Sequence, residues 1–286
     1  MSHKSPVLGI IGGSGLYQIP DLEVVEQIQC DTPFGAPSGP IVRGKLRGRE
    51  LFFLARHGAG HTISPSEIPY RANVYALKSL GVTSVLSVSA VGSLREEIVP
   101  GHLVIPDQLI DRTRSRVDTF FKEGIVVHVE MADPYCSAFQ ERLEEAAGES
   151  GAKVHKGGTL VCIEGPQFST RAESFMYRGF GANLVGMTAL PEARLVREAS
   201  MCYATLALAT DYDCWYEHHD SVTVEGVMEV MRHNIALARE TLTALMDRLS
   251  DPLECQCHNA LRYAVITQSE AIPQSTRERV RLLLEG

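Results

Sequence analysis

Apolar runs that end in loops of small or polar residues recur along the whole chain. Residues 7–13 read VLGIIGG, and residues 50–58 (ELFFLARHG) and 83–92 (TSVLSVSAVG) repeat the pattern. The runs GTLVCIEGPQF and YATLALATD follow further along the chain. Continuous apolar strands of this kind are typical of a sheet that is covered on both faces. The pattern therefore predicts the α/β class, with a central, mostly buried β-sheet flanked by helices.

Amphipathic helical runs lie between these strands. In residues 224–245, apolar side chains are spaced by three or four positions, which predicts one long helix with an apolar face. Asp133 and Pro134 predict the N-cap and first turn of another helix. Because no linker, repeat or low-complexity tract divides the chain, we predict a single domain over residues 1–286. Its C-terminal helical segment runs from about 250 to 286.

Net charge and apolar run length exclude several classes of function. The 286 residues carry a formal net charge of −8, whereas nucleic-acid binding calls for a basic face. No apolar run approaches the ~18 residues that a membrane helix needs. Glycines interrupt the N-terminal apolar run before it is long enough for a signal peptide. We therefore expect a cytoplasmic protein with no nucleic-acid or membrane partner.

Cysteines are scattered, with one exception. Of the seven, Cys255 and Cys257 form a C-x-C pair in the stretch ECQCH. Such a pair could form a labile disulfide, help to bind a metal or stay inert. A zinc site needs four ligands, usually with C-x-x-C spacing, and the sequence shows no second half. We expect free, inert thiols and no metal site.

The first loops that follow strands carry groups suited to an anion. In α/β sheets, ligands gather where strands end. The loop GIIGGSG lacks the third glycine of a dinucleotide site and the lysine of a Walker loop. Ser14 and the backbone N–H groups of this loop could bind a free oxyanion, or the loop could be a plain tight turn. Arg56 directly follows a strand, where a buried guanidinium needs an anionic partner. His57 and His61 are four apart, but the glycines between them argue against a helical metal pair.

Later loops add hydroxyl groups and apolar side chains. Ser89 belongs to the small-residue stretch SVSAVGSL (87–94) at the end of a strand, while Phe168 and Ser169 lie beside a turn, and Met187 and Thr188 end a short strand. Each residue alone also fits a cap, a turn or a core position. Together the loops offer hydroxyls, one arginine and glycine amides, which fits inorganic phosphate better than a nucleotide tail.

Two aspartates end the last apolar run. If the strand continues through ATDYDC, Asp211 and Asp213 share a face at a spacing of roughly 6–7 Å. Two negative charges at so short a distance raise the pKa of one of the two carboxyl groups. That carboxyl group keeps its proton and can donate it, while the other carboxylate accepts. The N7 atom and 6-amino group of adenine present the complementary pattern. A role in capping the following helix explains the two acids equally well. A metal site is disfavoured, because the nearby stretch EHHD lacks the spacing of metal ligands.

Seven motifs taken together resemble the methylthioadenosine phosphorylases of the trimeric purine nucleoside phosphorylase family. They run in order from Val7 to about Leu249, and the C-terminal stretch matches more weakly. The motifs are GIIGGSGL, DTPFG, ARHGAGHTISPSEIPYRANVYALKSLG, SAVGSLREEIVPGHLVIPDQLIDRT, IEGPQFSTRAESFMYR, MTALPEA and ATDYDCW. The resemblance implies a mixed sheet and phosphorolysis of 5′-methylthioadenosine, with inorganic phosphate as co-substrate, no cofactor and a homotrimer.

The resemblance also implies a role for individual residues. Asp211 and Asp213 are implied to be catalytic and to read the base, and Asp211 stands where relatives that prefer 6-oxopurines have Asn. The residues implied to bind phosphate are Ser14, Arg56, His57, Ser89, Ala90 and Thr188. Those implied to contact the rest of the substrate are Phe168, Ser169, Met187, Val224, Val227, Met228 and, donated by a neighbouring subunit, His128.

Three alternatives stay open on the sequence. The first is a purine nucleoside phosphorylase acting on adenosine or on the 6-oxopurine nucleosides inosine, guanosine and methylthioinosine. Asp211 argues against the 6-oxopurine nucleosides as substrates. The second is a nucleotide-binding regulatory module without catalysis. The third is an NAD-linked enzyme, which the missing glycine of the first loop disfavours.

Overall fold

The computed structural model describes residues 5–17, 19–216 and 224–285. Its strands are β1 (Leu8–Gly12), β2 (Glu23–Ile28), β3 (Ile41–Leu46), β4 (Arg49–Ala55), β5 (Ser84–Ser93), β6 (Leu103–Ile105), β7 (Gln108–Arg112), β8 (Val154–Lys156), β9 (Thr159–Ile163), β10 (Leu184–Gly186) and β11 (Cys202–Asp211). In the described ranges, these eleven strands form one mixed sheet with the order β2-β3-β4-β1-β5-β10-β9-β7, and β11, β6 and β8 branch from β5. The predicted α/β class with a mixed central sheet is confirmed.

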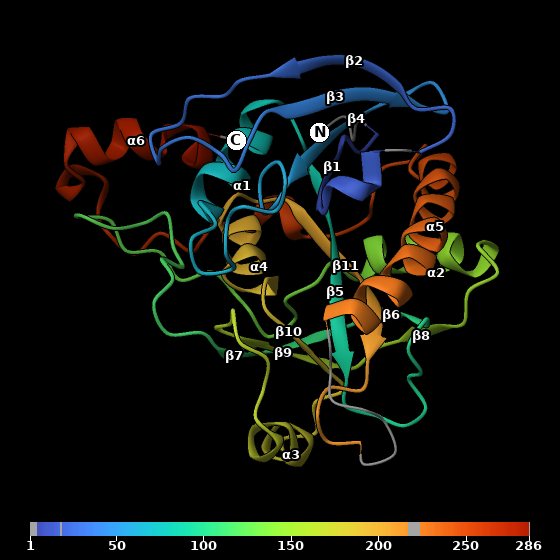
Figure 1. Ribbon diagram of the computed structural model, residues 1–286. Coiled ribbons are helices and arrows are strands. Elements are labelled where there is room, and N and C mark those ends of the chain that lie inside the picture. Colours follow the sequence, from blue (N-terminus) through green and yellow to red (C-terminus); the bar gives the residue numbers. More distant parts are fainter. Residues whose placement is uncertain (1–4, 18, 217–223, 286) are drawn as a thin grey trace.

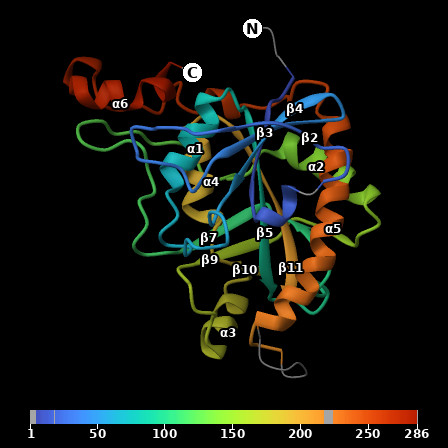
Figure 2. The same cartoon turned by 45° about the horizontal axis from the view of Figure 1, so that its top comes forward.

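Helices cover both faces of this sheet. They are α1 (Tyr70–Ser79), α2 (Ser137–Glu149), α3 (Arg171–Gly179), α4 (Ala189–Glu198), α5 (Val224–Arg248) and α6 (Gln274–Leu284), with short 3-10 helices η1 (Ser14–Tyr17), η2 (Cys257–Asn259) and η3 (Ser269–Ala271). Figures 1 and 2 show α1 and α4 on one face, and α2 and α5 on the other. None of the helices in the described part combines the length and apolar character needed to cross a bilayer.

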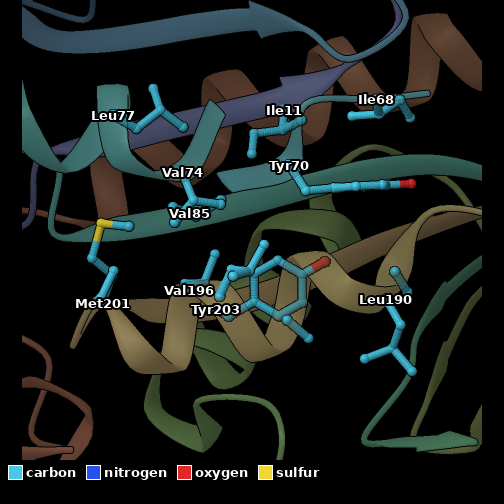
Figure 3. Close-up of a cluster of buried hydrophobic side chains, with 14 of the residues drawn as sticks. Ile11, Ile68, Tyr70, Val74, Leu77, Val85, Leu190, Val196, Met201 and Tyr203 are labelled. Carbon is cyan, nitrogen blue, oxygen red and sulfur yellow. The ribbon is translucent and has the colours of Figure 1, made fainter. Parts of the chain in front are cut away.

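Two apolar clusters fill the spaces between the layers. Figure 3 shows the cluster under α1 and α4, where Val74 and Leu77 of α1 meet Ile11 of β1, Val85 of β5 and Val196 of α4. A second cluster packs α2 and α5 against the opposite face. Burial from both sides explains why β1, β4 and β11 read as continuous apolar runs in the sequence.

Parallel strands place their carboxyl ends at one edge of the sheet. β1 is parallel to β4 and β5, and β5 is parallel to β11. We expected Ser89 in a loop, but β5 continues to Ser93 because β10 and β11 pair with its second half. The last pair between β1 and β5 is Ile11 with Ser87, so Ser89 lies in β5 just beyond the end of β1.

Helix boundaries agree with the sequence in one case and differ in another. α5 matches the predicted long helix. α2 begins later than predicted, because its N-cap is Cys136 and not Asp133. The segment after α5 contains η2, η3 and α6, and it packs on the domain: Val280 is buried in the cluster under α1 and α4, and Cys257 in the opposite cluster.

Candidate active site

Two hydroxyl groups from distant parts of the chain meet at the edge where β1 ends. The Oγ atom of Ser89 lies 3.1 Å from Oγ1 of Thr188, at the N-terminus of α4, and it accepts a hydrogen bond of 3.1 Å from Nη1 of Arg56. Thr188 makes no side-chain capping bond to its own helix. The structure thus brings together three of the residues that the sequence assigned to phosphate.

Arg56 has a different anionic partner from the one expected. Its buried guanidinium pairs with Glu192, with Nε 2.9 Å from Oε2 and Nη2 3.1 Å from Oε1. It also donates to the carbonyls of Val88 and Ile11 and to Ser87 Oγ. Because all of its N–H donors are used inside the protein, the side chain aligns Ser89 and has no donor left for a phosphate oxygen.

The imidazole of His57 is neutral at physiological pH. Burial lowers the pKa of His57 to about 4, and the ring stacks on His61 with centroids 4.1 Å apart. The Nδ1 atom lies 2.8 Å from the carbonyl oxygen of Ile63, and a carbonyl only accepts. The proton therefore sits on Nδ1, and Nε2 is an acceptor. His61 has a φ of 57°, so the two histidines lie in a turn.

The glycine loop after β1 forms η1 and packs against α5. Ser14 begins η1, and its side chain lies outside the described part of the structure. A Cβ atom on Gly12 would lie 2.5 Å from Leu16 Cδ1, so a larger residue here would displace the Leu16 side chain of η1. Arg239 of α5 donates from Nε to the Gly15 carbonyl at 3.2 Å. The long helix is thereby attached to the loop that was predicted to bind an oxyanion.

Asp211 and Asp213 come together by a turn and not by a strand. β11 ends at Asp211 after a register shift, and Asp213 has a φ of 51°, so the prediction that both acids share a strand face is wrong. The backbone N–H of Asp213 donates to Asp211 Oδ1 at 2.8 Å. Both acids crowd Gly92 of β5, where a Cβ atom would lie 3.0 Å from Asp211 Oδ1 and 3.3 Å from Asp213 Cβ.

The two carboxyl groups differ in their hydrogen bonds. Burial raises the pKa of Asp211, and burial raises the pKa of Asp213 to about 6, with a smaller contribution from the Asp211 charge. Asp211 accepts from Thr210 Oγ1 and from the Asp213 backbone, both at 2.8 Å. In the described ranges, no hydrogen bond of normal geometry reaches the buried Oδ2 of Asp213 or the hydroxyls of Ser169 and Ser174, although both hydroxyls lie close enough to Asp213 to offset part of the rise in its pKa. These atoms suit a polar ligand edge.

The loop around Ser169 lies beside the two aspartates. Cys214 Sγ is 3.2 Å from the Ser169 carbonyl oxygen, and the neighbouring Phe168 ring is half exposed. Trp215 anchors the same turn, because its Nε1 donates to the Ser93 carbonyl at 2.8 Å and Arg178 stacks on its ring. The loop that carries Phe168 and Ser169 therefore lies directly beside the turn that carries the two aspartates.

Most of the chain matches a known protein family. The sequence profile of the phosphorylase superfamily matches residues 7–247. The chain belongs to the phosphorylase superfamily. A relative, the S-methyl-5′-thioadenosine phosphorylase of Geobacter sulfurreducens, is 53% identical over 279 residues, which cover 97% of this chain and 98% of the relative.

Solved structures share both fold and sequence with this chain. A methylthioadenosine phosphorylase sourced from an Antarctic soil metagenomic library superposes with a TM-score of 0.92 at 45% identity, covering 98% of this chain and 99% of the other. The Schistosoma mansoni methylthioadenosine phosphorylase in complex with adenine has a TM-score of 0.83 at 35% identity, covering 98% of each chain. The predicted resemblance to the methylthioadenosine phosphorylases is confirmed.

Two charged residues that support the candidate site have no signal in the local sequence pattern. Glu192 is the buried partner of Arg56, and Tyr203 donates to it at 3.0 Å. Arg116 donates to the carbonyls of Met187 and Leu190 at 2.6 Å each and fixes the backbone just before and after Thr188. Their partners are distant in sequence: the expectation that a buried Arg56 needs an anion pointed to a residue such as Glu192, and no sequence signal pointed to Arg116.

Several of the predicted site residues are exposed or have side chains outside the described part of the structure. Ala90 follows Ser89 in β5 and is exposed. The side chains of Val224 and Val227 lie outside the described residues, and Met228 is 53% exposed at the start of α5. His128 is exposed, and its backbone N–H donates to the Ala264 carbonyl of the C-terminal segment at 2.9 Å. Their contacts with substrate stay predictions.

Proposed function

We propose that this protein catalyses the phosphorolysis of 5′-methylthioadenosine to adenine and 5-methylthioribose 1-phosphate, in the salvage of methionine and purines. One observation carries the proposal: β5 links the buried Asp213 and the half-buried Asp211 at Gly92 to the paired hydroxyls of Ser89 and Thr188. Three residues of a strand span roughly 10 Å. That length matches a nucleoside whose base meets the aspartates while its C1′ faces phosphate. The names of the relatives support the same reaction.

The aspartates stabilise the purine as it leaves. As the bond between C1′ and N9 breaks, negative charge grows on the base. Asp211, whose pKa burial raises, donates its proton toward N7 as a general acid. Asp213 accepts from the 6-amino group with its unpartnered Oδ2. The two acids titrate as a unit, so each role is partly shared.

Phosphate is both nucleophile and electrostatic stabiliser. Hydroxyls of Ser14, Ser89 and Thr188 and the backbone at Ala90 hold it beneath the ribose, while Arg56 aligns Ser89. His57 adds no charge, and its Nε2 accepts from a protonated phosphate oxygen. The anion stabilises the oxocarbenium-like sugar and then attacks C1′, so catalysis is mainly positioning and electrostatics. No metal or organic cofactor takes part in these steps.

The remaining substrate contacts follow from the family. Phe168 and Ser169 flank the base, and Met187 lies under the ribose. Val224, Val227 and Met228 surround the methylthio group, which cannot hydrogen-bond usefully. An apolar pocket discriminates by only about 1–3 kcal/mol per methylene-sized difference, so adenosine is a weak second substrate.

We also propose a homotrimer in the cytoplasm, with His128 reaching a neighbouring site. The net charge of −8 supports the expectation that the protein binds no nucleic acid.

A product assay tests the proposed reaction. Methylthioadenosine, adenosine and inosine are incubated in parallel, with and without phosphate, and free base is measured. We expect phosphate-dependent release of adenine, fastest from methylthioadenosine. Release that ignores phosphate would identify a hydrolase, preference for inosine would identify a 6-oxopurine phosphorylase, and no release would leave a binding module.

A further inference from the structure

Four cysteines from three separate parts of the chain converge at one point. Cys136 is the N-cap of α2, Cys202 is the first residue of β11, and Cys255 and Cys257 belong to the segment after α5. Their Sγ atoms all lie within 4.8 Å of one another. The sequence led us to expect no metal site, because the second pair of ligands is 53 or more residues away from the C-x-C pair. We propose that these four cysteines bind one zinc ion as tetrahedral thiolates.

The spacing of the sulfurs fits a metal better than disulfides. With zinc–sulfur bonds of about 2.3 Å, the edges of a tetrahedral site measure about 3.8 Å. The distance between the Sγ atoms of Cys202 and Cys255 is 3.4 Å, and the upper limit for the group is 4.8 Å. A disulfide needs about 2.0 Å, and all four cysteines are free thiols. Two disulfides also require only two close pairs, whereas here every sulfur is near every other.

The surroundings suit a buried anionic cluster. Cys136, Cys202 and Cys257 are buried within the apolar cluster of α2 and α5. One zinc ion with four thiolates carries a net charge of −2, which nearby positive groups offset. Arg197 Nη1 points at Cys257 Sγ from 3.9 Å, and the N-terminal end of α2, with its partial positive charge, begins at Cys136.

A set of four sulfur ligands selects a soft, tetrahedral ion. Sites of this composition hold zinc or iron, and closed zinc sites are structural. Binding replaces four S–H bonds by four zinc–sulfur bonds and releases four protons, so the step needs no oxidant. The site has no open position for substrate. It also lies at the opposite end of β11 from Asp211, and the ten residues of that strand span roughly 30 Å.

The consequence of the site is to attach the C-terminal segment to the domain. Zinc would join the starts of α2 and β11 to residues 255–257. That segment continues to Val265, which forms a β-bridge with Val127, and to Ala264, which accepts from the His128 backbone. The metal therefore holds in place the strip of chain that supports the His128 loop.

Metal content of the full-length protein tests this inference. The protein is expressed with zinc in the medium and purified with a thiol reductant and no chelator, and zinc is measured by atomic absorption. We expect one zinc per chain in the wild type and in Cys30→Ser, a matched control that removes a free thiol outside the cluster. Cys257→Ser and Cys255→Ser lose the metal. Cobalt in place of zinc gives thiolate charge-transfer bands and the d–d bands of a tetrahedral ion.

Stability supplies a second readout. A strong chelator lowers the Tm of the wild type and of Cys30→Ser and leaves Cys257→Ser unchanged. Wild-type protein that holds no zinc and no cobalt overturns the proposal, as does a disulfide within the cluster seen by mass spectrometry without reductant. If the cysteine variants fail to fold, the wild-type zinc content and cobalt spectrum still decide. Loss of the proposed phosphorolysis would not affect either measurement.

Discussion

At the scale of single residues, Asp211 and Asp213 show how a turn arranges two acids for different tasks. Asp211 is held by hydrogen bonds to both oxygens, while Asp213 keeps a buried oxygen without a partner in the described part of the chain. We expect Asp211→Asn to reduce kcat/KM for methylthioadenosine by about 100-fold or more, because an amide cannot give a proton to N7. Steady-state assays with methylthioadenosine and methylthioinosine measure the change in base preference. An unchanged ratio of the two substrates would show that Asp211 does not read the base.

The raised pKa of Asp213 predicts an acid limb in the rate profile. Its pKa of about 6 means that the carboxylate, which accepts from the 6-amino group, is lost as the pH falls through 6. We expect kcat/KM to decline below pH 6 in the wild type. Asp213→Asn keeps an acceptor oxygen that does not titrate. The pH profile of kcat/KM for this variant therefore lacks the acid limb of Asp213 and retains only the limb that comes from the titration of phosphate. If both profiles coincide at saturating phosphate, Asp213 is not the titrating group.

At the scale of elements, the ion pair between Arg56 and Glu192 connects β4 to α4. Both side chains are at most 2% exposed. We expect Glu192→Gln to lower the free energy of unfolding by about 3–5 kcal/mol, because it leaves a buried guanidinium without its countercharge. Urea denaturation measures this loss. Where the protein still folds, the KM for phosphate rises more than kcat falls, because Ser89 loses its alignment.

A surface ion pair provides the matched control for this substitution. Glu26 pairs with Arg43 at 2.9 Å, with 49% and 39% of the two side chains exposed, and Arg43 also pairs with Glu50. Glu26→Gln should leave both the free energy of unfolding and the KM for phosphate almost unchanged, because solvent screens exposed charges. Equal effects of the two substitutions would show that burial of the Arg56–Glu192 pair adds nothing to its contribution to the free energy of unfolding or to the KM for phosphate.

What the sequence could predict also depends on scale. Local periodicity identified α5 and the buried strands β1, β4, β5, β9 and β11, because a buried sheet and an amphipathic helix leave patterns in neighbouring residues, but it did not identify β2, β3, β6, β7 or β8. It misplaced Ser89 and the relation of Asp211 to Asp213, because the pairing of β10 and β11 with β5 and a positive φ are not encoded in apolar spacing. Partners such as Glu192 for Arg56 come from distant segments. Only the fold brings them together.

At the scale of the whole molecule, the exposed position of His128 bears on assembly. Figures 1 and 2 show the chain after β7 passing beside the C-terminal segment. If a trimer places His128 in a neighbouring site, sedimentation gives three copies. His128→Ala should then lower kcat/KM for methylthioadenosine by about 10-fold, the loss of roughly one hydrogen bond, with no change in the free energy of unfolding.

Mixed assemblies distinguish a shared site from one built within a single chain. Asp211→Asn and His128→Ala each impair one component, and the two variants are unfolded together and refolded as a mixture. In a shared site, the intact Asp211 of a His128→Ala chain meets the intact His128 of an Asp211→Asn neighbour, so the mixture is more active than the sum of its parts. If both residues serve the same chain's site, no combination restores an intact site, and the mixture is only as active as the two variants assayed separately.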